Sequence, residues 1–122
     1  MIMLGTNDLK ARFAVGAVEI TTSVETLVHA GRGFCTATGR PVQRILLVSP
    51  APISEVGEVG DQFTGGADKS LRLGAALRAA AQRLGVDFLD AGEHIRTSPV
   101  DGVHLDPAAH RALGEAVAAA VR

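Results

Sequence analysis

Three short apolar runs alternate along the chain with three stretches in which apolar residues recur at helical spacing. The runs cover residues 1–4, 44–48 and 86–90, and turn-forming or polar residues follow each of them. Short apolar runs that end at Pro, Gly or Asn are typical of buried parallel strands. The pattern therefore predicts an α/β fold, a parallel sheet covered by helices.

The first predicted helix carries an apolar stripe from Phe13 to Leu27, at steps of four and three residues. Gly31 is expected to end it, because glycine readily adopts the left-handed conformation that follows many helices. Residues 50–66 are rich in Pro, Gly and acidic side chains, and a long surface loop is expected there.

The second and third predicted helices have clearer boundaries. The second is expected to begin with Asp68 as N-cap and to end at Gly85. The third begins with Asp106 as N-cap and Pro107 at the first helical position, which is a strong start signal. The inward side chains expected in the second helix are Leu71, Leu77, Ala81 and Leu84.

Composition narrows the class of protein. A chain of 122 residues fits one domain, residues 1–122. The net charge of −1 and the four aromatic residues speak against nucleic acid or an acidic membrane as partner. Cys35 is the only cysteine, so an internal disulfide is excluded, and its Gly-rich surroundings predict a loop. Neither a signal-peptide pattern nor a membrane-spanning apolar run is present, so a cytoplasmic location is expected.

The first candidate for chemistry is the block Asp101-Gly102-Val103-His104. A histidine that acts as general base needs an acceptor at its other ring nitrogen, which fixes the tautomer and stabilises the imidazolium. An Asp three residues earlier in a turn can reach that nitrogen, and Gly102 permits the bend. Taken alone, the same spacing favours a structural turn capped by the carboxylate.

The second candidate is Gly5-Thr6-Asn7-Asp8, directly after the first apolar run. An Asn at the exit of a buried strand can aim its amide into a cleft and donate to a developing oxyanion. The alternative is that Asn7 and Asp8 form a turn and cap the next helix, which this block alone favours.

Together the two blocks resemble two conserved blocks of the SGNH (GDSL-type) hydrolases. Residues 3–10, 47–52 and 101–105 are similar, in the same order, to the arylesterase/acyltransferase-like members of that family. The resemblance implies a three-layer, flavodoxin-like fold, truncated in this chain to about three parallel strands with covering helices. It concerns the C-terminal part of the family's domain only.

The resemblance also assigns roles to individual residues. Asn7 corresponds to the oxyanion-hole asparagine, and Gly5 to the glycine that precedes it in the same block. The resemblance therefore implies that Gly5 and Asn7 both belong to the part of the site that binds the oxyanion and the substrate. Asp101 and His104 correspond to the triad acid and base. The family's nucleophilic Ser, in a G-D-S motif, and a Gly of a further block cannot be placed, because Met1 stands where the family's third strand begins.

Three functions remain open from the sequence. The first is an esterase or acyltransferase that cleaves small carboxylic esters through an acyl-enzyme, with the Ser supplied from elsewhere. The second is an inactive, truncated hydrolase that serves as an oligomerising or binding module, and the third is an unrelated small α/β domain. Ser49 and Ser54 follow the second apolar run, but neither lies in a strand-to-helix elbow that exposes a nucleophile.

Expected partners follow from the truncated sheet. Residues 1–4 would lie at an exposed apolar edge, which favours a homo-oligomer or a complementing N-terminal fragment. No cofactor is expected. A metal site formed by His94, Asp101, His104 and Asp106 is conceivable, but their spacing has no zinc-like signature.

Overall fold

The apolar run after Arg44 forms the strand at the centre of the molecule. In the computed structural model, which describes residues 1–122, β1 (Leu46–Ser49) pairs in parallel with β2 (Asp87–Asp90). All four residues of β1 are buried, as expected for a strand covered on both faces. The α/β class with parallel strands is therefore confirmed.

The first apolar run contributes less than a full strand to this sheet. Only Ile2 forms a bridge, in parallel with Leu47, and the regular sheet consists of β1 and β2 alone. Residues 1–4 lie at the edge of the sheet, beside β1. The first of the three predicted strands is therefore reduced to a single bridge.

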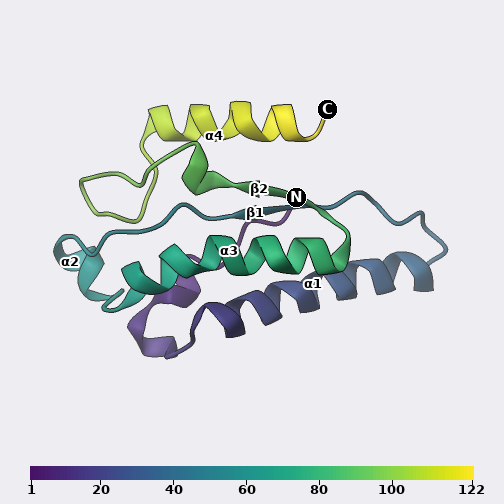
Figure 1. The fold of residues 1–122 in the computed structure, drawn as a ribbon, viewed down its shortest axis with the longest axis horizontal. Coiled ribbons are helices and arrows are strands. Elements are labelled where there is room, and N and C mark those ends of the chain that lie inside the picture. Colours follow the sequence, from purple (N-terminus) through teal and green to yellow (C-terminus); the bar gives the residue numbers. More distant parts are fainter.

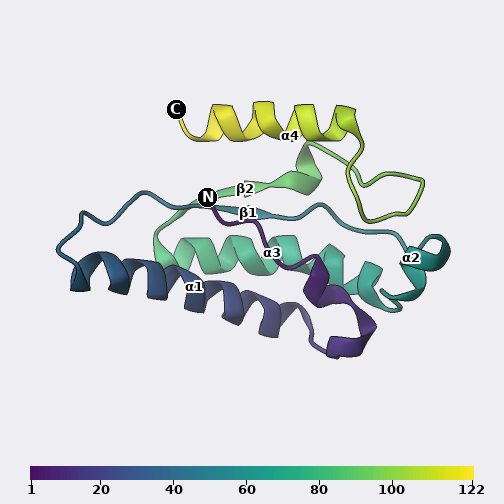
Figure 2. The ribbon, with the colours of Figure 1, turned by 180° about the vertical axis from the view of Figure 1, so that it is seen from behind.

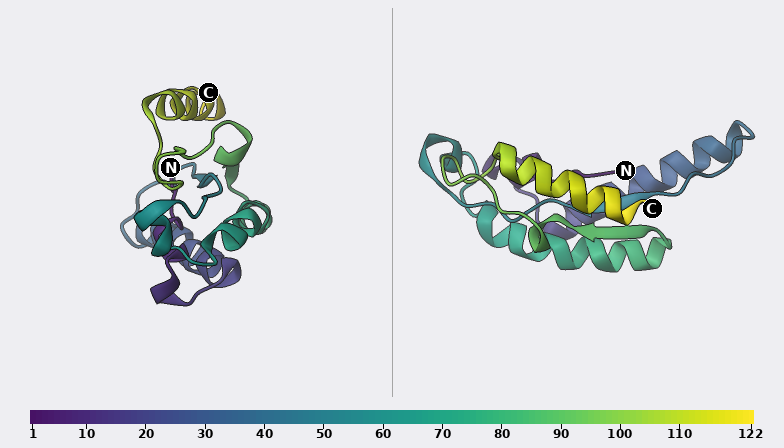
Figure 3. Two further views of the ribbon diagram at one scale, coloured as in Figure 1. Left: turned by 90° about the vertical axis from the view of Figure 1, so that its left-hand side faces the viewer. Right: turned by 90° about the horizontal axis from the view of Figure 1, so that it is seen from above.

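Helices cover both faces of the sheet (Figures 1 and 2). On one face α1 (Ala17–Ala37) packs against α3 (Gly66–Leu84), and α4 (Pro107–Ala120) covers the other. The three layers are separated in the end-on view of Figure 3. The predicted loop of residues 50–66 contains one short helix, α2 (Gly57–Asp61). No helix is both long and apolar enough to span a bilayer.

Side chains of β1 alternate between two hydrophobic cores, as the period of two in a strand requires. Leu47 belongs to the core beneath α1 and α3, together with Leu73 and other residues of those helices. Leu46 and Val48 belong to the second core, which Leu113 of α4 closes. The alternation therefore ties both helical layers to one short strand.

Helix α1 differs from its prediction at both ends. It starts at Ala17, and Phe13 lies in a separate 3-10 turn with 48% of its surface exposed. The helix continues through Gly31, which the sequence pattern predicted as its end. The guanidinium of Arg32 donates to the carbonyls of Leu84 and Gly85 at the end of α3, at 2.8 and 3.4 Å. This tertiary contact stabilises the helical conformation of α1 beyond Gly31.

Helix α3 also begins earlier than predicted. Its N-cap is Gly65, and Asp68 lies in its first turn without a capping hydrogen bond. Leu71, predicted to face inward, is 68% exposed, because the buried face of α3 passes through Ser70 and Leu73 and not through Leu71. That face carries Ser70, Leu73, Leu77, Ala80 and Ala81. Gly85 ends the helix in the left-handed conformation (φ +60°), as predicted.

The start of α4 is the boundary that the sequence predicted best, and it permits a direct test. The Asp106 carboxylate accepts a hydrogen bond from the Ala109 N–H at 2.7 Å, and Pro107 occupies the first turn. We expect Asp106→Ala to lower the free energy of unfolding by about 1 kcal/mol, the usual cost of losing an N-cap. Urea unfolding measures this, with Asp68→Ala as the control. An equal loss in both variants would contradict a capping role for Asp106.

Candidate active site

The block Asp101-Gly102-Val103-His104 forms a closed turn around the Asp101 carboxylate. Its Oδ1 accepts hydrogen bonds from the backbone N–H groups of Val103 and His104, both at 2.9 Å. Its Oδ2 lies 2.6 Å from His104 Nδ1. The predicted contact between the two side chains is therefore present, and the His104 side chain is 73% exposed.

These hydrogen bonds fix the protonation state of the pair. The backbone N–H groups of Val103 and His104, followed by the His104 ring, lower the pKa of Asp101 from 3.8 to about 2. Above that pH the carboxylate is ionised and can only accept, so Nδ1 of His104 carries the proton. The other ring nitrogen, Nε2, is left free to take a proton from a neighbouring group.

The lowered pKa predicts how the turn responds to acid. Because the pKa in the folded protein lies below the ordinary value, the ionised Asp101 stabilises the turn above pH 3.8. That contribution is lost as the pH falls towards 2. We expect the Asp101 Cγ resonance to titrate with a midpoint of about 2.

The His104→Ala variant is the matched control for this titration. It removes the ring donor and leaves both backbone donors, so the midpoint should rise and still remain below 3.8. A midpoint of 3.8 in the unsubstituted protein would show that the carboxylate is not held by these donors.

The turn is held in place by a second loop, the one that follows β1. The Ser54 N–H donates to the Gly102 carbonyl at 2.8 Å, and the Gly102 N–H donates to the Ser98 carbonyl at 2.7 Å. Gly102 has a φ of +72°, and a Cβ on it would lie 2.1 Å from the Ser54 oxygen. Only glycine fits here. Sequence reasoning explained the bend at Gly102 but could not identify Ser54, 48 residues away, as its partner.

The second candidate block forms a 3-10 turn over Asn7–Leu9. Asn7 is exposed, and its side chain makes no hydrogen bond with the rest of the chain. The next helix begins only at Ala17, with Gly16 at its N-cap, so the alternative that Asn7 and Asp8 cap it is wrong. The amide of Asn7 is therefore free to donate to a ligand.

Gly5 has a different position from Asn7. It is buried with a φ of +119°, and a Cβ on it would lie 3.1 Å from both Ile20 and Leu73. Its lack of a side chain lets the end of the first apolar run pass beneath α1 and α3. Gly5 thus positions the turn that carries Asn7, and its predicted contact with substrate remains a prediction.

Both candidate blocks lie at the same end of the molecule, beyond the carboxyl ends of the parallel strands (Figure 1). Leu9, next to Asn7, and Val103, next to His104, belong to one hydrophobic cluster that also contains Ile53. Functional groups in open α/β sheets collect at this edge. The fold therefore places two blocks that are almost a hundred positions apart in sequence at one end of the molecule.

The structure also places the other residues that the sequence analysis considered for nucleophilic or metal-binding roles. Ser49 is fully buried, and its hydroxyl donates to the Pro50 carbonyl, so it is not available as a nucleophile. Ser54 is exposed beside Gly102, but no hydrogen bond joins it to the His104 ring. Cys35 lies within α1 and not in a loop. The four residues of the conceivable metal site are not assembled into a ligand group.

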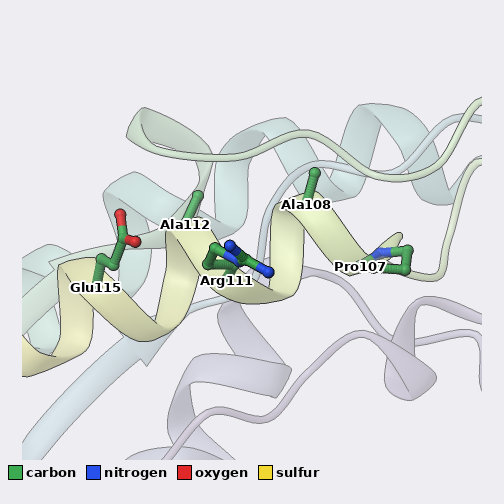
Figure 4. A pocket seen from close by; sticks show the side chains of 5 residues that line it. All are labelled: Pro107, Ala108, Arg111, Ala112 and Glu115. Atoms are coloured by element: carbon green, nitrogen blue, oxygen red, sulfur yellow. The ribbon is translucent and has the colours of Figure 1, made fainter.

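A shallow hollow of ≈ 370 Å³ lies along α4 (Figure 4). Its lining side chains are Pro107, Ala108, Arg111, Ala112 and Glu115. All five belong to one helix, so the hollow is a surface depression and not a cleft between elements. We therefore assign the candidate site to the turn of Asp101–His104 and not to this hollow.

Several of the solved structures similar to this chain are esterases. Est24, a carbohydrate acetylesterase from Sinorhizobium meliloti, shares 34% identity, and 98% of this chain superposes on it with a TM-score of 0.93. The aryl esterase of M. smegmatis shares 37% identity over 99% of this chain, with a TM-score of 0.91. The chain spans 58% of the length of each of these proteins. No family model and no curated protein matches the chain.

Proposed function

This chain has the fold of the SGNH/GDSL-type hydrolases and resembles their C-terminal part, and from that premise we propose that it forms the acid–base part of an ester hydrolase site. The observation that carries the proposal is the Asp101–His104 pair, with its 2.6 Å contact and free Nε2. In this proposal the nucleophilic serine is supplied by a polypeptide segment other than residues 1–122. The substrate is a small carboxylic ester.

The proposed reaction has two halves, acylation of the serine and hydrolysis of the acyl-serine. In each half His104 accepts one proton and then donates it. As the serine oxygen attacks the ester carbonyl, His104 Nε2 takes the hydroxyl proton, and the ionised Asp101 stabilises the imidazolium. The Asn7 side-chain N–H donates to the oxygen that becomes negative in the tetrahedral intermediate. His104 then returns the proton to the leaving alkoxide, and an acyl-serine remains. In the second half water attacks the acyl-serine and gives a proton to His104, which returns it to the serine oxygen as the carboxylic acid is released.

The electrostatics of the turn support this assignment. Three donors keep Asp101 ionised, so its charge is present when His104 becomes positive. The ionised carboxylate at Nδ1 also holds the ring in the tautomer that leaves Nε2 as an acceptor. The exposure of His104 leaves Nε2 accessible to a serine delivered from a separate segment.

A chimera tests the proposal. This chain replaces the matched part of the M. smegmatis aryl esterase, to which it is 37% identical. We expect hydrolysis of p-nitrophenyl acetate and a covalent fluorophosphonate adduct on a serine of the esterase segment. A folded chimera, shown by circular dichroism, that gives neither would favour the non-catalytic binding module.

A further inference from the structure

Ser70 of α3 is a buried polar residue that takes no part in the proposed reaction. It is 3% exposed and lies in the second turn of the helix. Its hydroxyl donates to the Ala67 carbonyl at 2.6 Å, and its Oγ accepts a hydrogen bond from the Ile53 N–H at 3.1 Å. Serine hydroxyls inside helices often bond only to a carbonyl of their own helix. The hydroxyl of Ser70 also joins its helix to the loop that follows β1.

The backbone N–H of Ile53 depends on this hydroxyl. Ile53 is 5% exposed, and its N–H has no other hydrogen-bond acceptor in the chain. A buried N–H without an acceptor is strongly disfavoured, so the Oγ of Ser70 fixes where this part of the loop lies. The Ile53 side chain belongs to the same hydrophobic cluster as Val103, the neighbour of His104. Helix α3 therefore sets the position of a residue that packs beside the candidate site.

Ser54, the next residue of the loop, connects it to the candidate site. Its N–H donates to the Gly102 carbonyl at 2.8 Å. The following residue, Glu55, accepts a hydrogen bond from the Ala67 N–H at 3.1 Å through its carboxylate. The loop is thus attached to the start of α3 on both sides of Ser54. Because Glu55 is exposed and Ser70 is buried, water competes less for the attachment that Ser70 makes.

We propose that Ser70 is a positioning residue, which holds the turn that carries His104 through the loop after β1. The inference rests on the proposed function, in which His104 must lie close to a serine of another segment. Helix α3 is a firm support, because Leu73 and Leu77 are 1% and 0% exposed in the core. Its start lies at the same end of the molecule as the turn (Figure 1). Displacement of a catalytic group by about 1 Å can cost about a hundredfold in rate.

Ser70→Ala in the chimera with the M. smegmatis aryl esterase tests this role. We expect kcat for p-nitrophenyl acetate to fall roughly tenfold to a hundredfold, because His104 is no longer held in place. KM should change by less than about twofold, since a buried residue of α3 does not contact the substrate. Ser70→Thr keeps a hydroxyl that can bond to the preceding turn, and it should restore kcat to within about threefold.

Thr21→Val is the matched control, because it also removes one buried helical hydroxyl. Thr21 is 5% exposed, and its hydroxyl donates to the Ala17 carbonyl at 2.7 Å within α1. It accepts no hydrogen bond from a loop. Its loss should leave kcat unchanged even where it lowers stability. Circular dichroism at the assay temperature shows that each variant is folded.

Hydrogen exchange in the chain itself requires neither activity nor a stable Ser70→Ala variant. In the unsubstituted chain the amides of Ile53 and Ser54 should both be protected, because both donate to firmly held acceptors. In Ser70→Ala both amides should exchange faster. The midpoint of the Asp101 Cγ titration should also rise from about 2 towards 3.8, as the turn loosens.

The outcomes separate the positioning role from the proposed function. An unprotected Ile53 amide in the unsubstituted chain would overturn the role of Ser70. So would a folded Ser70→Ala chimera with kcat within about twofold of the unsubstituted one, or an equal loss of kcat in Thr21→Val. If Ser70→Ala speeds exchange at Ser54 while the unsubstituted chimera is inactive, the attachment of the turn is supported and the proposed function fails.

Discussion

Replacement of His104 by alanine in the chimera should reduce kcat for p-nitrophenyl acetate roughly a millionfold, as loss of the base does in enzymes with a Ser-His-Asp triad. The physical reason is that no other group is placed to take the serine proton. The His104 ring is held by one hydrogen bond, to Asp101, and its Nε2 is the only free basic nitrogen in that turn.

Two further substitutions test the role of His104, one at its partner Asp101 and one at the nearby His110. Asp101→Asn should cost about ten-thousandfold in kcat, because the amide no longer fixes the tautomer or balances the imidazolium charge. His110→Ala is the matched control, since His110 is exposed on α4 and only six residues from His104. Steady-state kinetics measure all three. If His104→Ala keeps activity within about tenfold, the base is another group and the assignment fails.

Gly102→Ala should have the largest effect on stability. Alanine at a φ of +72° is strained, and its Cβ would overlap the Ser54 oxygen, which lies 2.1 Å from the Cβ position. We expect a loss of about 3 to 4 kcal/mol in the free energy of unfolding, from backbone strain and overpacking together. The loop after β1 must move away, and the hydrogen bond between Ser54 and Gly102 is lost.

Gly85→Ala is the control that measures backbone strain at a positive φ without overlap of the added Cβ. Gly85 also has a positive φ, +60°, but nothing lies within 4 Å of its Cβ position. Its replacement should therefore cost only about 1 kcal/mol. Thermal unfolding at equal protein concentration measures both variants. Equal losses would mean that contact with Ser54 does not constrain the Asp101–His104 turn.

The sequence alone determined the features that depend on neighbouring residues. The Asp106 cap and Pro107 start α4, and Gly85 ends α3, because these residues act on the backbone next to them. The approach of Asp101 to His104 belongs to the same class, since the two residues are only three positions apart in one turn.

The tertiary structure decided whatever depends on distant partners. Helix α1 passes Gly31 because Arg32 bonds to the end of α3, and no local pattern contains that contact. Leu71 faces solvent because the register of α3 is set by the sheet beneath it. The first apolar run pairs with β1 only at Ile2, and its local pattern does not show how far the pairing extends. Ser54 reaches Gly102 across 48 residues, and this contact holds the candidate site in place.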